Sequence, residues 1–321
     1  MRILVAGATG AVGRQLVPRL VAAGHDVAGT TRTQEKLDGL RSMGATPLLV
    51  DALDPDQVAQ TVGGFEPEVI VHELTDLRGL NMRNFEAAFR MTNRLRTEAL
   101  DHLLAAGRAV GVRRFVAQSY AGWPFARTGG AVKTEDDPLD PSPAGPMREA
   151  FAAIGHLERA VTEASWTEGV VLRYASLYGT GTGLHPGGEQ LELIRKRQWP
   201  VIGDGAGVWS FLHVEDAAEA TLAAVERGPR GIYNLADDEP ATVAEWLPLV
   251  ARRIGAKPPL RVPRWLGRLL AGEAATVVMT EVRGASNAKA KRELGWQPRH
   301  AWRQDLGATA TVADPARAAA A

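Results

Sequence analysis

The stretch Arg2-Ile3-Leu4-Val5-Ala6-Gly7-Ala8-Thr9-Gly10-Ala11-Val12-Gly13 decides the fold of this chain. It begins with a short apolar run, which is typical of a buried parallel strand. An amphipathic helix follows the glycines, and Gly24 stands where its C-terminal cap belongs. Glycines at this place let the backbone approach a pyrophosphate, which the N–H groups of the first helical turn attract. The order of strand, glycine loop and helix predicts dinucleotide binding, against the alternative of a tight turn without a ligand.

Composition restricts the class of protein. The chain has 321 residues, 45% of them hydrophobic, and its 37 basic and 37 acidic residues balance, which favours no nucleic-acid partner. No apolar stretch is long enough to span a bilayer and no signal sequence is recognisable, so we expect a cytoplasmic protein without a membrane partner. The absence of cysteine excludes disulfides, thiolate metal sites and cysteine nucleophiles, and no metal site is expected.

Strand-like and helix-like segments alternate along the first half of the chain. This rhythm predicts an α/β fold with a Rossmann-type, doubly wound parallel sheet. In such a sheet the cofactor lies outside the C-terminal ends of the strands. After the first strand, we expect strands at 26–31, 45–50, 69–72, 114–118 and 170–173, and the longest helix at 84–106.

Later segments are irregular and rich in Pro and Trp, which indicates a second, smaller unit. We expect a dinucleotide-binding domain over 1–175, to which residues 210–238 return. The C-terminal substrate lobe is expected to comprise 176–209 and 239–306. Residues 307–321 are rich in Ala and offer little material for a core, so they are expected to form a flexible tail.

An ordered series of motifs runs along the chain. The motifs are Gly7-x-x-Gly10-x-x-Gly13, Asp51-Ala52, Thr92-Asn93, Gly111-Val112-Arg113-Arg114-Phe115-Val116 leading to Ser119, Leu172-Arg173-Tyr174, Tyr178-Gly179, Gly203-Asp204-Gly205, Phe211-Leu212-His213-Val214-Glu215-Asp216 and Lys291-Arg292-Glu293-Leu294-Gly295-Trp296. With these motifs the chain resembles the extended short-chain dehydrogenase/reductase family, and within it the NAD-dependent epimerase/dehydratase group. The resemblance covers nearly the whole chain, and it implies that Asp51 contacts the adenine and that Tyr174 lies near the nicotinamide.

The choice between NAD and NADP depends on the end of the second strand. That strand ends in Thr30-Thr31-Arg32, without an acidic residue for the ribose hydroxyls. Arg32 can form a bidentate contact with a 2′-phosphate, so the sequence favours NADP and leaves NAD possible; the alternative for Arg32 is a solvated residue that begins the next helix. The residues expected around the cofactor are Gly7, Thr9, Gly10, Ala11, Val12, Gly13, Arg32, Asp51, Ala52, Leu74, Thr75, Asn93 and Tyr174.

Catalysis in the resembled family requires Tyr-x-x-x-Lys, with a Glu four residues further on. Glu158 fits that Glu, which places Ala150 and Ile154 at the Tyr and Lys positions, and no Tyr-x-x-x-Lys occurs anywhere in the chain. Ser119 and Tyr120, at the end of the fifth strand, are then the expected proton donors; capping or packing is the alternative role for both. Further options are His156, His213 and Glu149, of which His156 can also be a solvent-side helix residue and His213 a structural one. Without a nearby Lys, the pKa of the Tyr120 phenol is expected to stay near about 10, which favours reduction over oxidation at neutral pH.

The expected substrate pocket is aromatic. Family members that act on sugar nucleotides carry Arg-Asp-Phe before the His-Val-x-Asp segment, and that Arg holds the diphosphate. This chain has Trp209-Ser210-Phe211 there, and Trp cannot pair with phosphate. We therefore expect Trp123, Tyr178, Trp199 and Trp209 to line a pocket for a small aromatic or apolar carbonyl or hydroxyl compound.

Three functions remain open at this point. The favoured one is an NADP-dependent oxidoreductase or epimerase with a non-standard proton donor, acting on a small-molecule substrate. The second is a catalytically inactive NADP-binding sensor or regulator, and the third is an accessory protein that its cofactor stabilises. The missing Tyr-Lys pair favours the second and third, and the shaped Trp-rich lobe favours the first. A homodimer is possible in each case.

Overall fold

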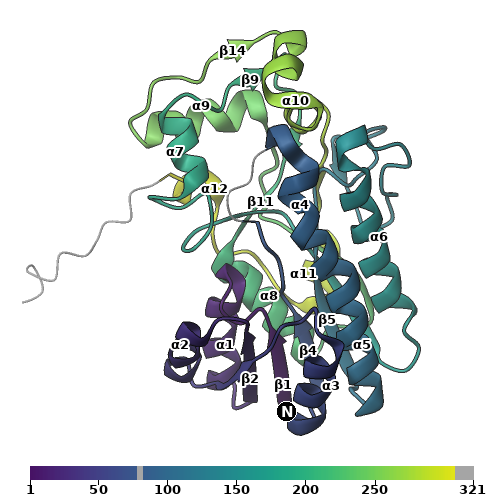
Figure 1. Ribbon diagram of the computed structural model, residues 1–321. Helices are drawn as coiled ribbons and strands as arrows, with labels where there is room; N and C mark the ends of the chain where they lie inside the picture. The colour runs from purple at the N-terminus through teal and green to yellow at the C-terminus, as the bar shows by residue number, and fades with distance from the viewer. Residues whose placement is uncertain (78–81, 308–321) are drawn as a thin grey trace, which may run out of the picture.

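A seven-stranded parallel sheet forms the centre of the molecule in the computed structural model, which describes residues 1–77 and 82–307 (Figure 1). The strand order is β12-β7-β5-β4-β1-β2-β3, so the chain reverses direction across the sheet between β1 and β4. This confirms the doubly wound α/β fold and adds one strand, β12, to the six expected ones. The strands are β1 (Arg2–Ala6), β2 (Asp26–Thr31), β3 (Thr46–Leu49), β4 (Val69–His72), β5 (Arg114–Tyr120), β7 (Glu168–Tyr174) and β12 (Gly231–Leu235).

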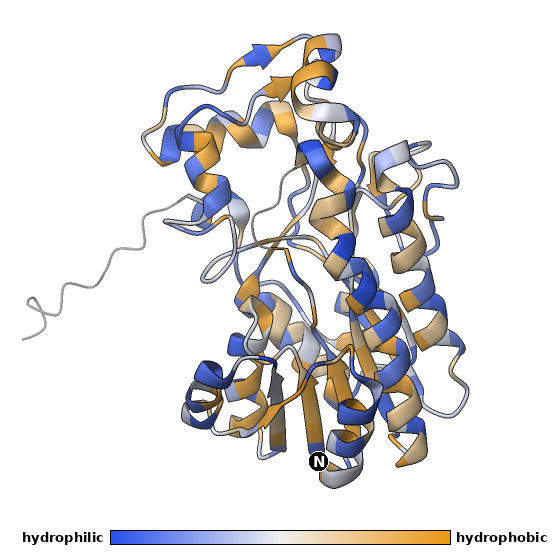
Figure 2. Ribbon diagram, viewed as in Figure 1, coloured by the Kyte–Doolittle hydropathy of each residue, from blue (hydrophilic) through white to orange (hydrophobic). Residues whose placement is uncertain are grey.

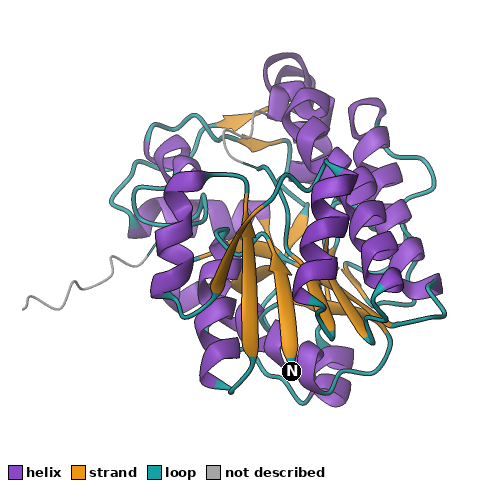
Figure 3. Ribbon diagram, turned by 60° about the horizontal axis from the view of Figure 1, so that its bottom comes forward, coloured by secondary structure: helices purple, strands orange, loops and turns teal. Residues whose placement is uncertain are grey.

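Helices cover both faces of the sheet, and the apolar strands lie between them (Figures 2 and 3). Two apolar clusters result, one on each face, because alternate strand residues point to opposite sides. On one face pack α1 (Ala11–Ala22), α2 (Leu37–Ser42), α8 (Val214–Glu226) and α11 (Ala288–Leu294). On the other face pack α3 (Pro55–Phe65), α5 (Leu100–Ala109) and α6 (Arg148–Glu163).

The long helix expected at 84–106 is continuous, but its hydrogen-bond pattern changes in the middle. It consists of α4 (Phe85–Arg94), a π-helical turn η3 (Leu95–Ala99) and α5. A π turn contains an extra residue, so a carbonyl group can be left for another donor. Here His72 Nε2, at the end of β4, donates to the Leu95 carbonyl oxygen at 2.9 Å.

The smaller lobe has its own aromatic core, which includes Trp246, Trp302 and Phe211. The described part of the chain contains no helix with the length and apolarity needed to cross a membrane. The expected flexible tail lies, from residue 308 onward, outside the described residues. The remaining elements are η1 (Gln34–Lys36), η2 (Met82–Asn84), β6 (Val132–Lys133), η4 (Gly145–Met147), β8 (Ser176–Tyr178), α7 (Glu189–Arg195), β9 (Val201–Ile202), β10 (Val208–Trp209), β11 (Phe211–His213), β13 (Ala241–Thr242), α9 (Val243–Arg253), β14 (Arg261–Val262), α10 (Arg264–Thr280), β15 (Gly284–Ala285) and α12 (Trp302–Asp305).

Candidate functional site

The glycine loop joins β1 to α1. Each of its three positions requires glycine for a different reason. Gly7 has a φ of +94°, and a Cβ there would lie 2.7 Å from the Glu73 carbonyl. A Cβ at Gly13 would lie 2.5 Å from the Gly7 oxygen, so α1 packs directly on the loop. Gly10 is exposed, and a Cβ there would lie 3.2 Å from the Gly7 oxygen. Packing therefore requires Gly7 and Gly13, whereas Gly10 keeps an open backbone surface.

The N-terminus of α1 fits a bound anion. Gly10 is the N-cap residue, no side chain caps the helix, and no acidic residue lies in its first turn. The first N–H groups, at Ala11 to Gly13, therefore have no side-chain partner and carry the positive end of the helix dipole. Together with Thr9, this turn has the geometry that receives the pyrophosphate of a dinucleotide.

Two further expected cofactor segments follow neighbouring strands at the same edge of the sheet. Arg32 follows β2, with a 55% exposed side chain whose Nη2 lies 3.4 Å from Asp76 Oδ2. Asp51 and Ala52 follow β3, and the exposed Asp51 accepts a hydrogen bond from the Leu53 N–H at 3.0 Å. Both segments are accessible to a ligand that lies along the carboxyl edge.

Asn93, on α4, carries a buried amide group. Neither its Oδ1 nor its Nδ2 has a hydrogen-bond partner among the described residues. Leu74 and Thr75, which follow β4, are half-buried. A buried polar group without a partner destabilises a protein by about 1–3 kcal/mol, so an orphaned amide at this edge suits a site that is completed by a ligand.

Tyr174, at the end of β7, has a buried side chain, and its place near the nicotinamide stays a prediction. Its side chain is 1% exposed, so it has almost no surface for a nicotinamide. Its hydroxyl donates to Glu73 Oε1 at 2.7 Å and lies 2.5 Å from Thr221 Oγ1. Burial raises the pKa of the Glu73 carboxyl to about 8, which keeps this carboxyl protonated at neutral pH.

Ser119 and Tyr120 lie within β5 and point to opposite sides, as neighbouring strand residues do. Ser119 is 1% exposed, and its hydroxyl donates to Glu158 Oε1 at 2.8 Å. Arg173 Nε and Nη2 each donate to Glu158 at 2.7 Å. Ser119 is expected from the sequence to give a proton to the substrate. In the fold its O–H group already donates to a buried carboxylate, so it is not free to donate to a substrate.

Tyr120 instead borders a small aromatic cavity at the junction with the second lobe. The cavity has a volume of about 10 Å³, room for about one water, and Trp123, Ser176 and Trp209 also line it. The Tyr120 hydroxyl lies 3.1 Å from Ser176 Oγ, and its ring lies 5.3 Å from that of Trp123. Burial raises the pKa of Tyr120 above 10, so the expectation of an unshifted phenol is not met.

The other two expected substrate residues lie in the core of the second lobe. Tyr178 is 2% exposed and its ring packs against His213 at 5.0 Å. Trp199 packs against Trp246 at 5.7 Å and Trp209 at 6.0 Å. The structure thus brings Trp123 and Trp209 to the Tyr120 cavity, whereas Tyr178 and Trp199 support the lobe behind it.

The helix that should carry the Tyr-Lys pair has buried apolar residues at both positions. Ala150 and Ile154, on α6, are 1% and 0% exposed. They belong to a cluster with Phe85, Phe89 and Trp123. No polar group at either position could move a proton.

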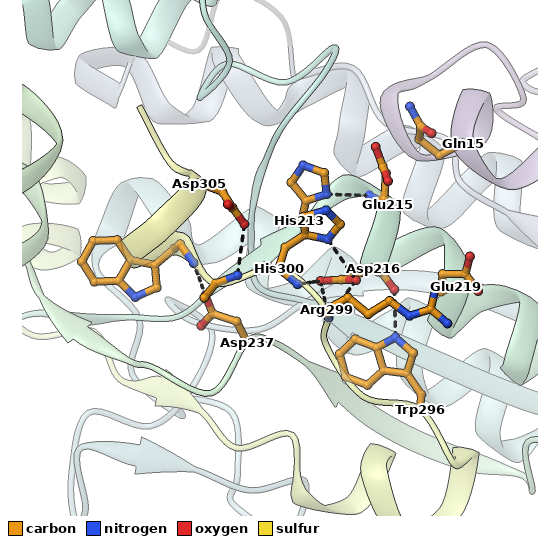
Figure 4. A network of polar contacts seen from close by, with 12 residues as sticks. Gln15, His213, Glu215, Asp216, Glu219, Asp237, Trp296, Arg299, His300 and Asp305 are labelled. Carbon is orange, nitrogen blue, oxygen red and sulfur yellow. Dashed lines mark hydrogen bonds and ion pairs between the residues drawn. The ribbon is translucent and has the colours of Figure 1, made fainter. Parts of the chain in front are cut away.

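A polar network fastens the C-terminal segment to α8 (Figure 4). The Asp216 carboxylate accepts from the backbone N–H groups of Arg299 at 3.1 Å and His300 at 2.9 Å, and Trp296 Nε1 donates to the Asp216 carbonyl at 3.1 Å. The Asp237 carboxylate similarly accepts from the Trp302 N–H at 3.0 Å. These contacts join the lobe to the dinucleotide-binding sheet.

Within this network, His213, Glu215 and His300 form a group of potential metal ligands among the described residues. The two imidazole rings stack at 3.8 Å with an angle of 23° (Figure 4). Ring-nitrogen lone pairs lie in the ring plane, so stacked rings do not direct them at one ion. His213 Nδ1 also accepts from the Glu215 N–H at 3.3 Å, which caps α8. We assign this group to capping and packing.

Sequence reasoning did not single out three buried residues near the crevice, namely His72, Glu73 and Arg96. His72 and Glu73 directly follow the apolar run of β4, and their position at a strand end was the available signal. Arg96 gave no signal, because a charged residue on an amphipathic helix normally faces solvent.

The fold and glycine loop define a dinucleotide-binding protein of the Rossmann type. The chain belongs to the NAD-dependent epimerase/dehydratase family, whose model matches residues 3–236. This finding confirms the resemblance, and it makes an NAD(P)-dependent oxidoreductase or epimerase the class of protein.

Several relatives extend along the whole chain. A Streptomyces protein named 3-diazoavenalumate denitrifying reductase is 45% identical over 315 residues, which cover 96% of this chain and 99% of its own. A UDP-glucose 4-epimerase of Mycolicibacterium smegmatis is 26% identical over 330 residues, covering 96% and 97%. The solved UDP-glucose 4-epimerase of Thermotoga maritima, 21% identical, covers 96% of each chain with a TM-score of 0.75, which shows the shared fold.

Proposed function

We propose that the chain is a nicotinamide-dependent reductase whose substrate is a small aromatic diazo compound. The observation that carries this proposal is that two apolar, buried residues, Ala150 and Ile154, stand at the place of the proton-donating pair. A reaction that needs no proton from the protein suits such a site. The similarity to the Streptomyces reductase, whose name specifies a diazo carboxylate and its denitrification, supports the substrate class.

The electron balance of this reaction explains why the Tyr-Lys pair is dispensable. Reduction of a carbonyl leaves an alkoxide that must be protonated, which is the role of a general acid. An arenediazonium ion that accepts a hydride at its terminal nitrogen gives a neutral aryldiazene. The C–N bond then breaks, the N–H proton moves to the ring carbon and N₂ leaves, so the net change is replacement of the diazo group by hydrogen. A bound NADPH or NADH supplies the hydride and its two electrons.

The residues of the chain then bind and orient the aromatic ring. Trp123 and Trp209 are the aromatic side chains beside Tyr120, and the cavity that they line must widen to admit a ring, because it has room for about one water. Trp209 has no charge with which to hold a sugar-nucleotide diphosphate. The Tyr120 hydroxyl stays protonated at neutral pH and can donate a hydrogen bond to an oxygen on the ring. We further propose NADP as the preferred cofactor, because β2 is followed by Arg32 and not by the acidic residue that binds the ribose hydroxyls of NAD.

A direct test uses 3-diazo-4-hydroxybenzoate, in which the neighbouring oxygen stabilises the diazo group. Enzyme, this compound and NADPH deuterated on the transferred face should give 4-hydroxybenzoate that carries deuterium at the former C–N carbon or loses it to water, together with stoichiometric N₂. Boiled enzyme controls for direct reduction by NADPH. Bound NADPH without consumption of this compound would contradict the proposal and favour the inactive sensor, which the same missing Tyr-Lys pair also suits.

A further inference from the structure

Arg96 carries a buried guanidinium group for which the described residues provide no hydrogen-bond partner. It belongs to the π turn η3 and is 3% exposed. Its Nε and Nη1 are enclosed and have no hydrogen-bond partner among the residues that the structure describes. Arg114, another buried arginine, differs because its guanidinium donates to the carbonyls of Ala224 and Gly228 and to Glu168.

The carboxylate closest in its electrostatic effect on Arg96 is that of Glu158, and it already receives hydrogen bonds from other residues. Glu158 attracts the Arg96 charge, but its two oxygens receive Arg173 and the Ser119 hydroxyl at 2.7–2.8 Å. The buried group therefore contains two cations and one anion. Burial lowers the pKa of Arg96 to about 10, so the guanidinium is still charged at neutral pH.

Further unpartnered polar atoms lie around Arg96. His72 donates through Nε2 to the carbonyl of Leu95, and its Nδ1 has no partner in the described chain. Asn93, with its orphaned amide, precedes Arg96 by three residues and therefore lies on the same side of the helix. The Arg96 charge also acts on Tyr120, whose side chain borders the aromatic cavity.

An isolated buried charge destabilises a folded protein, and it is normally paired or bound to a ligand. We propose that Arg96 pairs with an anionic oxygen, a carboxylate or a phenolate, of the aromatic substrate and thereby selects acids over neutral compounds. This inference rests on the proposed function for the substrate class. It is independent of whether the diazo group is reduced, because recognition of the anion precedes chemistry.

Calorimetry with unreactive probes on the NADP⁺-saturated protein tests this recognition. If Arg96 pairs with the carboxylate, we expect 4-hydroxybenzoate and benzoate to bind more tightly than methyl 4-hydroxybenzoate. If the phenolate is read, 4-hydroxybenzoate should gain affinity as pH rises and benzoate should not. The charge-assisted contact corresponds to about a 10- to 150-fold preference. Arg96→Met should abolish it, Arg96→Lys should restore part of it, and the affinity for NADP⁺ should not change.

A stability measurement separates this role from a structural one. Arg96→Met should unfold at the same or a higher urea concentration than the parent protein, because no partner loses its hydrogen bonds. Arg114→Met is the matched control and should unfold at a lower concentration. The inference is overturned if the parent protein shows neither preference, if Arg96→Met keeps it, or if Arg96→Met weakens NADP⁺ binding instead. Loss of diazo turnover alone, with the anion preference intact, would contradict only the proposed function.

Discussion

The Ser119 hydroxyl donates a 2.8 Å hydrogen bond to the carboxylate of Glu158, deep between β5 and α6. Arg173 of β7 clamps the same carboxylate, so three elements meet at one buried anion. Tyr120, the next residue, faces the aromatic cavity instead. The sequence predicts the same role for these two adjacent hydroxyl groups, but in the fold one holds a buried carboxylate and the other borders the cavity.

Ser119→Ala and Tyr120→Phe should consequently have different effects. Ser119→Ala should lower the free energy of unfolding by about 1–3 kcal/mol, because a buried acceptor loses one donor, and should leave turnover near that of the parent protein. Tyr120→Phe should reduce any carbonyl reduction by about 10²–10⁴-fold but diazo reduction far less, since only the former needs a general acid. Urea unfolding and steady-state kinetics measure both. Loss of all turnover in Ser119→Ala would refute this division.

Arg173→Met should destabilise the fold strongly. The Glu158 carboxylate would lose both hydrogen bonds that it receives from a guanidinium group, and Arg96 makes none to it, so removal of this partner of the buried ion pair costs about 3–5 kcal/mol. Arg195→Met, in an exposed pair with Glu192 on α7, is the control and should change stability by less than about 1 kcal/mol. Equal unfolding midpoints for the two variants would show that Glu158 finds another partner.

Glu73 should make stability depend on pH. The ordinary pKa of a glutamate carboxyl is 4.5, and burial in the fold, which favours the neutral form, raises the pKa of Glu73 to about 8. The folded protein thus keeps a proton that the unfolded chain releases, so the free energy of unfolding falls as pH rises from about 4.5 through about 8. Glu73→Gln should flatten this slope in urea titrations at several pH values. The exposed Glu149→Gln should not, and an unchanged slope in Glu73→Gln would contradict the assignment.

Gly10→Val should block the cofactor while the fold persists. Gly10 has an ordinary φ of −74° and is exposed, so the side chain is accommodated but projects where a pyrophosphate would lie. Titration should show at least about a tenfold loss of NADP⁺ affinity with an unchanged circular dichroism spectrum. Gly63→Ala, where an added Cβ meets nothing within 4 Å, is the control. Unaltered affinity in Gly10→Val would move the binding site elsewhere.

Arg32→Ala should weaken NADP⁺ and spare NAD⁺. Loss of one charged phosphate contact corresponds to about 1.5–3 kcal/mol, or roughly 10- to 150-fold in affinity. Arg41→Ala, on the exposed side of α2, should change neither affinity. If the parent protein binds both cofactors equally, Arg32 does not discriminate between them.

The sheet could be predicted because each central strand is a short apolar run between glycines or helices, and such runs are visible locally. The strand β12 is an edge strand with polar Asn234, so its pattern is weaker. The role of Tyr174 could not be read from its motif, because it depends on Glu73 and Thr221, which are distant in sequence. Side-chain partners across elements are set by packing, and no local pattern contains them.

The site was predictable to the same extent. The glycine loop follows from local chemistry, and the apolar Ala150 and Ile154 follow from the motif they replace. Arg96 does not, because its burial depends on a π turn that no residue type announces. A buried cation is also contrary to the usual expectation for a helix surface.

The π turn also determines which change of length the helix can absorb. Phe85 and Phe89, before the turn, pack in the cluster around Trp123, whereas Leu100 and Leu103, after it, pack on the sheet. A π turn contains one residue more than an α-helical turn, so deletion of one residue from 95–99 would restore regular α-helix and leave both pairs close to their present faces. The same deletion would remove the free carbonyl group that receives His72 and the position that Arg96 occupies. Homologues that lack the extra residue should therefore keep the packing of both pairs and lack a buried arginine at this point of the helix.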